Sequence, residues 1–369
     1  MKQLLETHAI TGGGTATLYL EQKPYLNFGG NNYLALNDKD ELRNAAQEEL
    51  AKGSGYSMFL PRAYGARESA FEAVEKEACL FFDQEAAVYL PSGYFIGHAA
   101  LTGLRPKYDV LILDELAHWC IWDAAKLAEV PIHTFKHCDT DDLQRVLKEL
   151  PLGQRPLIGT DGVFATMGNL PQLNEYANLA KKRDGIVFVD ESHAIGVVGT
   201  KGRGTHEHFE CGGNVFFGAT LSKGLCAQGA VFVGDYETVE RAQKSTVLRG
   251  SSKGSPISAS VSAAALRYVR THPEQIAELG EKTKFLRNAL RNLGLHIADS
   301  PAPIVSFSHG DFETVRGIQV HLFENNIYVL HSNYIAAGVS GALRCSVFGD
   351  HTYDQLNHLV TTLKKYLEI

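Results

Sequence analysis

The sequence IVFVDESH, at residues 186–193, is the stretch that best indicates the fold. Its first four residues are Ile, Val and Phe without a polar interruption, and such runs are typical of strands buried on both faces of a parallel sheet. The run ends in Asp190, and His193 follows three residues later. Because open α/β sheets bind ligands at the carboxyl ends of their strands, both side chains are candidates for a functional site.

Further apolar runs of similar length occur along the first two thirds of the chain. They lie at residues 86–90, 110–113, 156–159, 215–218 and 230–234. Polar segments with helical spacing, such as residues 141–150 and 173–182, separate several of them. This alternation predicts an α/β domain built on a large, mostly parallel sheet.

Beyond about residue 255, the pattern changes to longer helical segments with a few short apolar runs. The chain has 369 residues, which exceeds the roughly 250–300 residues at which a single core stops growing. We therefore predict an N-terminal segment at residues 1–35, a large domain at 36–255, and a smaller α+β C-terminal domain at 256–369.

Charge and hydropathy exclude several classes of partner. The formal net charge is −7, so we expect no basic surface that would hold nucleic acid or an anionic membrane. No run of about 18 apolar residues is present to span a membrane. The N-terminal sequence also lacks the apolar core of a signal peptide, and a cytoplasmic location is the expectation.

The six cysteines are scattered and include no CxxC pair. Such spacing argues against a disulfide framework or a metal cluster and favours reduced thiols. We therefore expect no bound metal.

Asp190 is the first candidate for a cofactor-binding residue. An acid at a buried strand end is costly unless a cation faces it. A protonated pyridine nitrogen is such a cation, and an Asp facing it is typical of sites for pyridoxal 5′-phosphate (PLP). The alternative for Asp190 is a helix N-cap, because Asp is common before a turn of this kind.

Lys223 is the second candidate, in the sequence TLSKG that follows the apolar run at 215–218. A lysine in a desolvated site, or close to a cationic ring, has a lowered pKa that suits Schiff-base chemistry. Thr220 and Ser222 could offer hydroxyl groups to a phosphate. The alternative is that Lys223 is a solvated surface charge, as most lysines are.

Two more turns contain candidate site residues. Ser92, Gly93 and Tyr94 follow the run at 86–90 and open a predicted helix, where backbone N–H groups favour an anion such as phosphate. His118 follows the run at 110–113 and could stack on a flat ring. The alternative for Ser92, Gly93 and Tyr94 is a strand–helix turn that binds no ligand. The alternative for His118 is a structural role.

Taken together, these motifs resemble those of the α-oxoamine synthases, which are fold-type I PLP-dependent transferases. The matching motifs are SGY, DExxH, a GVFxxxG loop, DExHxxG and TxSK, in that order, and the likeness extends from about Tyr25 to the end of the chain. Residues 25–34 (YLNFGGNNYL) and Ala342-Leu343-Arg344 match further family segments.

The resemblance implies a role for each matched residue. Lys223 would hold PLP as a Schiff base and later move the α-proton, while Asp190 would pair with the pyridine nitrogen. His193 would hydrogen-bond the phenolic oxygen, and His118 would stack on the ring. The phosphate or its surroundings would be bound by Ser92, Gly93, Tyr94 and Thr220. Ser252 would reach the cofactor phosphate of the partner subunit.

On the substrate side, the resemblance implies that Asn31 and Arg344 hold the substrate carboxylate, because the planar fork of arginine matches two carboxylate oxygens. The reaction would join an amino acid to an acyl-CoA and release CO2 and coenzyme A to give an α-amino ketone. The protein would be a homodimer with active sites at the interface.

Several positions depart from the family pattern. Fewer residues precede Tyr25 than is usual, so elements that cover the site or touch the acyl chain could be absent. Met58 replaces the arginine of a GSGGSR motif that begins at Gly53-Ser54-Gly55, and Phe71 replaces a histidine. Ala342 stands where the family has an arginine, and Asp161 where it has a glutamate. These changes point to a divergent acyl donor or acceptor.

The sequence also allows two other hypotheses about function. The same fold supports PLP-dependent aminotransferases and lyases, because fold alone does not fix the reaction. The chain could also be a non-catalytic subunit of a heterodimer. Lys253, in the segment SSKGSP, could meet a CoA phosphate, although a lysine in a Ser/Gly loop is usually only solvated.

Overall fold

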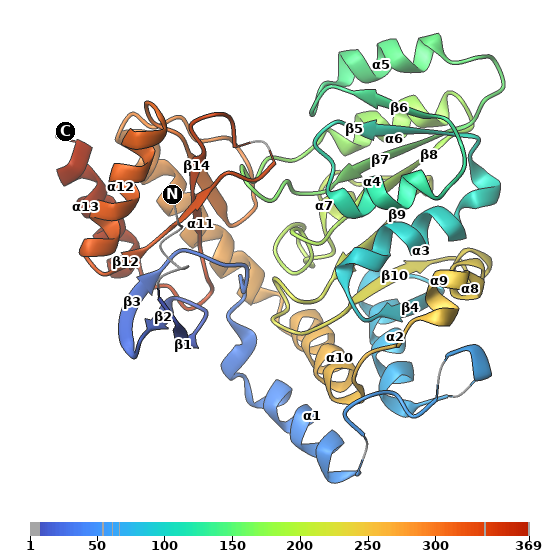
Figure 1. The fold of residues 1–369 in the computed structure, drawn as a ribbon, viewed down its shortest axis with the longest axis horizontal. Coiled ribbons are helices and arrows are strands. Elements are labelled where there is room, and N and C mark those ends of the chain that lie inside the picture. Colours follow the sequence, from blue (N-terminus) through green and yellow to red (C-terminus); the bar gives the residue numbers. More distant parts are fainter. Residues whose placement is uncertain (1–7, 54, 61, 66, 336, 368–369) are drawn as a thin grey trace. The chain divides into compact units, whose positions relative to one another are not determined.

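The computed structural model describes residues 8–53, 55–60, 62–65, 67–335 and 337–367, so Ser54 of the GSG match lies outside it. The chain folds as two compact units (Figure 1). The larger unit comprises residues 38–163 and 170–273, and the smaller one contains the remaining described residues.

The larger unit is built on a seven-stranded sheet of order β4-β10-β9-β8-β7-β5-β6. Its strands are β4 (Ala86–Leu90), β10 (Ala230–Gly234), β9 (Val215–Thr220), β8 (Ile186–Asp190), β7 (Pro156–Asp161), β5 (Val110–Asp114) and β6 (Ile132–Phe135). Only β10 runs antiparallel to its neighbours. Every residue of β5, β7 and β8 is buried, which confirms the large, mostly parallel sheet expected from uninterrupted apolar runs.

Helices of the larger unit pack around this sheet, and apolar side chains of α3, α4 and α8 join the strands in one core. The helices are α1 (Asp40–Ala51), α2 (Ser69–Phe82), α3 (Ile96–Gly103), α4 (Trp119–Lys126), α5 (Thr140–Glu149), α6 (Leu173–Lys181), α7 (Thr205–His208), α8 (Tyr236–Lys244), α9 (Thr246–Gly250) and α10 (Pro256–Thr271). Short 3-10 turns lie at Leu36–Asp38, Arg62–Tyr64, Gly93–Phe95 and Arg105–Lys107.

Helix α10 belongs to the larger unit, whereas the predicted small domain began at residue 256. The helix packs against α1 and α2 through small side chains such as Ala259 and Ala263. Arg267 and Arg270 also pair with the nearly buried carboxylate of Glu77 on α2, at 2.9 and 3.1 Å. The change in pattern near residue 255 therefore marks a long helix rather than a domain boundary.

The described residues of the smaller unit form two sheets and three α-helices. One sheet has the order β1-β2-β3-β12 and the other β11-β14-β13. The strands are β1 (Ile10–Gly13), β2 (Thr17–Leu20), β3 (Lys23–Asn27), β11 (Ile304–Phe307), β12 (Ile327–Tyr328), β13 (Leu330–Ser332) and β14 (Ala342–Ser346), and the helices are α11 (Glu274–Asn292), α12 (Phe312–Glu324) and α13 (Tyr353–Leu367).

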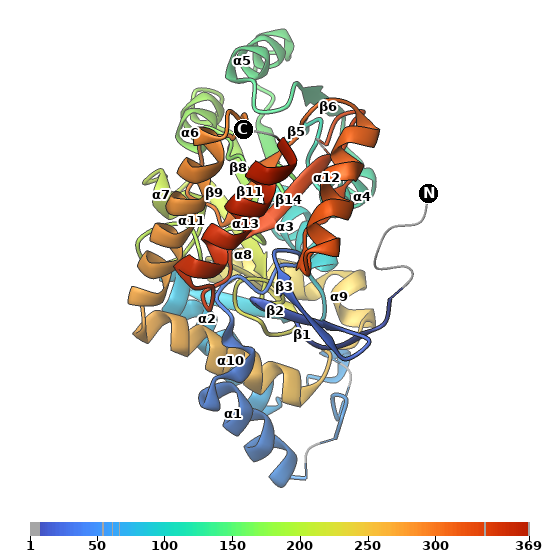
Figure 2. The same ribbon diagram turned by 90° about the vertical axis from the view of Figure 1, so that its left-hand side faces the viewer.

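Within this unit, helix α13 packs on α11 and α12 (Figure 2). Strand β3 pairs in parallel with β12, so the N-terminal segment is part of a sheet completed by the C-terminal region. No described helix is long and apolar enough to cross a membrane.

The core of the larger unit depends on Phe188, which is fully buried in the centre of β8. We expect Phe188→Ala to lower the free energy of unfolding by about 3–5 kcal/mol, because the change removes buried contacts and leaves a cavity. Leu152→Ala is the matched control, since Leu152 is 96% exposed. Urea unfolding of both variants checks this, and equal losses would contradict the assigned core.

Candidate active site

Two buried carboxylates lie side by side at the carboxyl end of the large sheet. Asp161 ends β7 and Asp190 ends β8, and the two residues are direct partners in the parallel pairing of these strands. Their exposed fractions are 9% and 5%. Burial, followed by the charge of Asp190, raises the pKa of Asp161 well above its usual value. A cation at this place would relieve the repulsion between the two acids.

Asp190 has hydrogen-bond donors on both oxygens. The backbone N–H of Ser192 donates to Oδ1 at 2.9 Å, and the thiol of Cys120 donates to Oδ2 at 3.6 Å. Burial and then the charge of Asp190 raise the pKa of Cys120, so this thiol keeps its proton and can donate it. Cys120 is a site residue that sequence reasoning missed, because its position in the first turn of α4 carries no motif.

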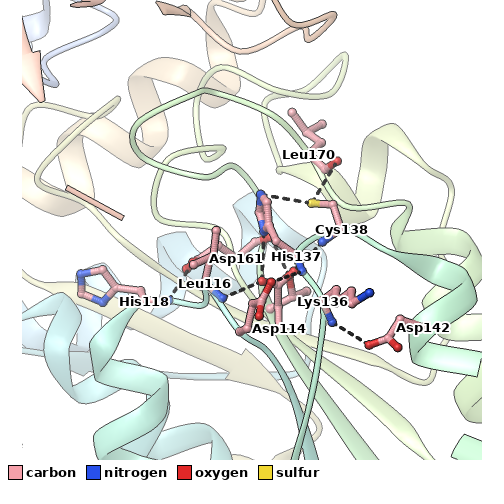
Figure 3. Close-up of polar contacts among 11 residues, drawn as sticks. Asp114, Leu116, His118, Lys136, His137, Cys138, Asp142, Asp161 and Leu170 are labelled. Atoms are coloured by element: carbon pink, nitrogen blue, oxygen red, sulfur yellow. Dashed lines mark hydrogen bonds and ion pairs between the residues drawn. The ribbon is translucent and has the colours of Figure 1, made fainter. Parts of the chain in front are cut away.

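His118 caps helix α4 beside these acids (Figure 3). Its backbone N–H donates to Asp161 Oδ2 at 2.9 Å, and its Nδ1 accepts the N–H of Cys120 at 3.2 Å. Burial lowers the pKa of the imidazole; the charge of Asp190 opposes this and that of Lys223 reinforces it. His118 is therefore neutral near pH 7, which suits a ring that stacks on a cationic partner.

The turn that carries Lys223 lies close to the turn after β8. The N–H of Thr220, at the end of β9, donates to Ser192 Oγ at 3.0 Å. A Cβ on Gly224 would lie 2.5 Å from the carbonyl oxygen of Ile195, so only glycine allows this approach. Lys223 is half-buried here, and its charge acts on both His118 and Asp161.

The Ser92–Tyr94 turn meets the end of β9. A Cβ on Gly93 would lie 2.9 Å from Cβ of Thr220, so glycine is required for this contact. Ser92 Oγ accepts the N–H of Tyr94 at 3.3 Å, and Thr220 Oγ1 lies 2.9 Å from Ser222 Oγ. Hydroxyl groups from two turns thus gather next to a helix start, an arrangement that suits a phosphate.

Glu191, between Asp190 and His193, has a structural role. It is fully buried and accepts hydrogen bonds from the N–H and hydroxyl of Thr205 and from the N–H of His206. Its carboxylate therefore holds the first turn of α7. His193 is half-buried in the same turn.

Ser252 and Lys253 lie in the loop before α10. Ser252 is exposed, and its Oγ accepts the N–H of Gly254 at 3.0 Å. Lys253 is only 9% exposed, and its Nζ lies 5.3 Å from the ring centre of Phe71, while its N–H faces Met58 Sδ at 3.2 Å. The expectation of a solvated Lys253 was therefore wrong, because two of the unusual residues, Met58 and Phe71, cover it.

Asn31 and Arg344 meet within the smaller unit. Arg344 is 4% exposed, and its Nη2 donates to Asn31 Oδ1 and to the hydroxyl of Tyr33, both at 2.8 Å. Its other donors reach Ser346 Oγ and the carbonyl oxygens of Gly30 and Ala165. Ala342 is fully buried in the same strand.

The residues of the larger unit fit PLP in charge and in hydrogen bonding. Asp190 offers a carboxylate to a pyridinium nitrogen, and His118 offers a neutral ring. The turns at Ser92 and Thr220 offer hydroxyl groups to a phosphate, and the charge of Lys223 acts on His118 and Asp161.

The chain matches the family of class I and II aminotransferases over residues 23–363. It is 30% identical over 353 residues to an 8-amino-7-oxononanoate synthase of Thermosipho melanesiensis, covering 95% of this chain and 90% of the relative. It is 31% identical to an enzyme of the same name from Treponema denticola, covering 98% of this chain and 92% of the relative.

Solved structures with the same fold include a Sphingomonas wittichii serine palmitoyltransferase, with a TM-score of 0.90, 22% identity, and coverage of 98% of this chain and 92% of that one. An 8-amino-7-oxononanoate synthase from Francisella tularensis has a TM-score of 0.79 and 23% identity, with coverage of 93% and 98%. The motifs, the fold and these likenesses together lead to one conclusion: the chain belongs to the class I and II aminotransferase family and, within it, to the α-oxoamine synthases.

Proposed function

We propose that this protein is a PLP-dependent acyltransferase that condenses an amino acid with an acyl thioester such as acyl-CoA. The products are an α-amino ketone, CO2 and the free thiol. The observation that carries the proposal is the buried pair Asp161 and Asp190, with Lys223 within electrostatic range. Bound PLP supplies an electron sink for negative charge that develops at the substrate α-carbon.

Asp190 is the residue that keeps the pyridine nitrogen protonated. The N–H of Ser192 and the thiol of Cys120 stabilise its ionised form by hydrogen bonding. Burial, followed by the charge of Asp190, raises the pKa of the neighbouring Asp161 well above its usual value. His118 would stack on the cofactor ring as a neutral imidazole, and His193 would hydrogen-bond the phenolic oxygen.

Lys223 would hold the cofactor through Nζ, and its amine would move the proton of the substrate α-carbon. This requires a neutral amine, which a half-buried site next to a cationic ring favours. Ser92, Gly93, Tyr94 and Thr220 bind the phosphate or its surroundings. In the smaller unit, Asn31 and Arg344 hold the substrate carboxylate.

The acyl-transfer reaction is favoured over the alternatives by the curated relatives, which are named 8-amino-7-oxononanoate synthases. An aminotransferase on this fold would release a keto acid and need no thioester. A non-catalytic subunit would have no use for Lys223, Asp190 and His118 together, and the chain keeps all three.

We also propose a homodimer in which Ser252 reaches the partner subunit's cofactor phosphate, which agrees with its exposed position in a loop. A cytoplasmic location is proposed on the six free cysteines, since free thiols persist in reducing compartments.

The reaction type is tested by following thiol and CO2 together. We expect free CoA and CO2 from the amino-acid carboxyl group to appear in equal amounts, and only when amino acid and acyl-CoA are both present. A thiol reagent and carboxyl-labelled amino acids measure the two products while the acyl length is varied. Keto acid formation without thiol release would instead establish the aminotransferase alternative.

The role of Lys223 is tested by Lys223→Ala. Borohydride reduction followed by mass spectrometry should find PLP attached covalently to the wild-type chain and to a Lys253→Met control, but not to Lys223→Ala. Lys253 is a suitable control because its side chain is also largely buried in the larger unit. Covalent PLP in Lys223→Ala would assign the anchor to another residue.

The two acids allow a matched comparison. Asp190→Asn should lower kcat at least about 100-fold, the scale on which positioned protons contribute to rate. Asp161→Asn should lower it less than about tenfold, since an amide oxygen can still accept the N–H of His118. Steady-state kinetics of both variants measures the two values of kcat. Equal losses of kcat would mean that Asp161 and Asp190 share the negative charge.

A further inference from the structure

A second polar cluster lies at the same end of the large sheet, outside the residues used above. It consists of Asp114, the last residue of β5, together with His137 and Cys138 in the turn after β6 (Figure 3). Asp114 is fully buried, and the other two are half-buried. One ligand atom from each residue lies within 4.8 Å of those from the other two. Carboxylate, imidazole and thiol groups are all metal ligands.

The cluster is held by hydrogen bonds to Asp114. Its Oδ1 lies 3.0 Å from His137 Nδ1, and its Oδ2 accepts the N–H of Cys138 at 2.9 Å. Cys138 has a φ of 53°, in the left-handed region, so the turn adopts a conformation that few side chains favour. These contacts orient the imidazole and leave its Nε2 facing the thiol.

The distance between the two facing atoms matches a metal site. His137 Nε2 lies 3.7 Å from Cys138 Sγ. Zinc binds imidazole nitrogen at about 2.0–2.1 Å and thiolate sulfur at about 2.3 Å, and a tetrahedral angle then separates the two atoms by about 3.6 Å. A carboxylate on the other ring nitrogen is also the usual support for a metal-bound histidine.

Tyr176, on helix α6, supplies an independent observation. Its side chain is fully buried, and its hydroxyl has no hydrogen-bond partner among the described residues. Burial, followed by the charges of Cys138 and Asp114, raises the pKa of this phenol. A buried polar group without a partner is rare.

We propose that Asp114, His137 and Cys138 form a binding site for a thiophilic divalent metal ion, for which Zn²⁺ is the probe. Cys138 Sγ and His137 Nε2 bind the metal directly, and Asp114 holds His137 through Nδ1. Binding forms a metal–sulfur bond and releases the thiol proton to solvent. Water occupies further coordination positions, and the carbonyl oxygen of Leu170 lies 3.9 Å from the sulfur.

The site borders the cofactor residues without sharing any of them. Asp114 Oδ1 accepts the N–H of Leu116 at 2.9 Å, and the same turn continues to His118 (Figure 3). The metal is therefore proposed in addition to PLP and takes no part in binding it.

Zinc titration of the untagged holoenzyme against a chromophoric chelator tests the site. The wild type should bind one Zn²⁺ per chain at this site, and X-ray absorption at the zinc edge should show one sulfur at about 2.3 Å. Cys138→Ser should remove the sulfur signal and weaken binding at least about tenfold, and Asp114→Asn should weaken it about 10–100-fold, the usual cost of losing a carboxylate that orients a ligand.

Cys79→Ser is the matched control, since Cys79 is another half-buried thiol, on helix α2, and it should leave zinc binding unchanged. Circular dichroism verifies that each variant is folded. The proposal is overturned by a wild type that fails to compete with the chelator, by a zinc spectrum without sulfur, or by a folded Cys138→Ser variant that binds as tightly as the wild type.

Discussion

The active-site region depends on one electrostatic constraint, the placement of two carboxylates at the ends of adjacent parallel strands. Asp161 and Asp190 are paired in register, and both are shielded from water. Burial, followed by the charge of Asp190, raises the pKa of Asp161 well above its usual value. The sheet therefore favours a cationic group at its carboxyl edge, and a protonated pyridine ring meets that requirement.

Several turns around the sheet edge hold the two carboxylates in place. Ser192 and Cys120 donate to Asp190, while the backbone of His118 donates to Asp161. Close backbone approach at Gly93 and Gly224 brings two further turns against the same edge. Because each contact leaves little room for a larger residue, the position of Lys223 follows from packing as much as from its own side chain.

Much of the large unit could be predicted from sequence, because strands buried on both faces leave uninterrupted apolar runs such as residues 186–190. The candidates at strand ends followed from the same runs. Cys120 and Glu191 could not be assigned, since their roles depend on hydrogen bonds to residues in other turns. Helix α10 was placed in the wrong unit because its ion pairs with Glu77 leave no local signal.

The Asp114 cluster illustrates the same limit. Asp114 and His137 are 23 positions apart, and only the pairing of β5 with β6 brings them together, so the cysteine spacing gave no indication of a metal site. On the substrate side, Met58 and Phe71 departed from the family pattern without an evident reason. In the structure both contact the buried Lys253, so these substitutions change packing beside the loop of Ser252.

We propose that Asp190 keeps the cofactor nitrogen protonated. Nitrogen-15 NMR of the enzyme reconstituted with PLP labelled at the pyridine nitrogen tests this most directly. We expect the chemical shift of a protonated pyridinium at neutral pH. The shift of an unprotonated pyridine, with both acids in place, would contradict it.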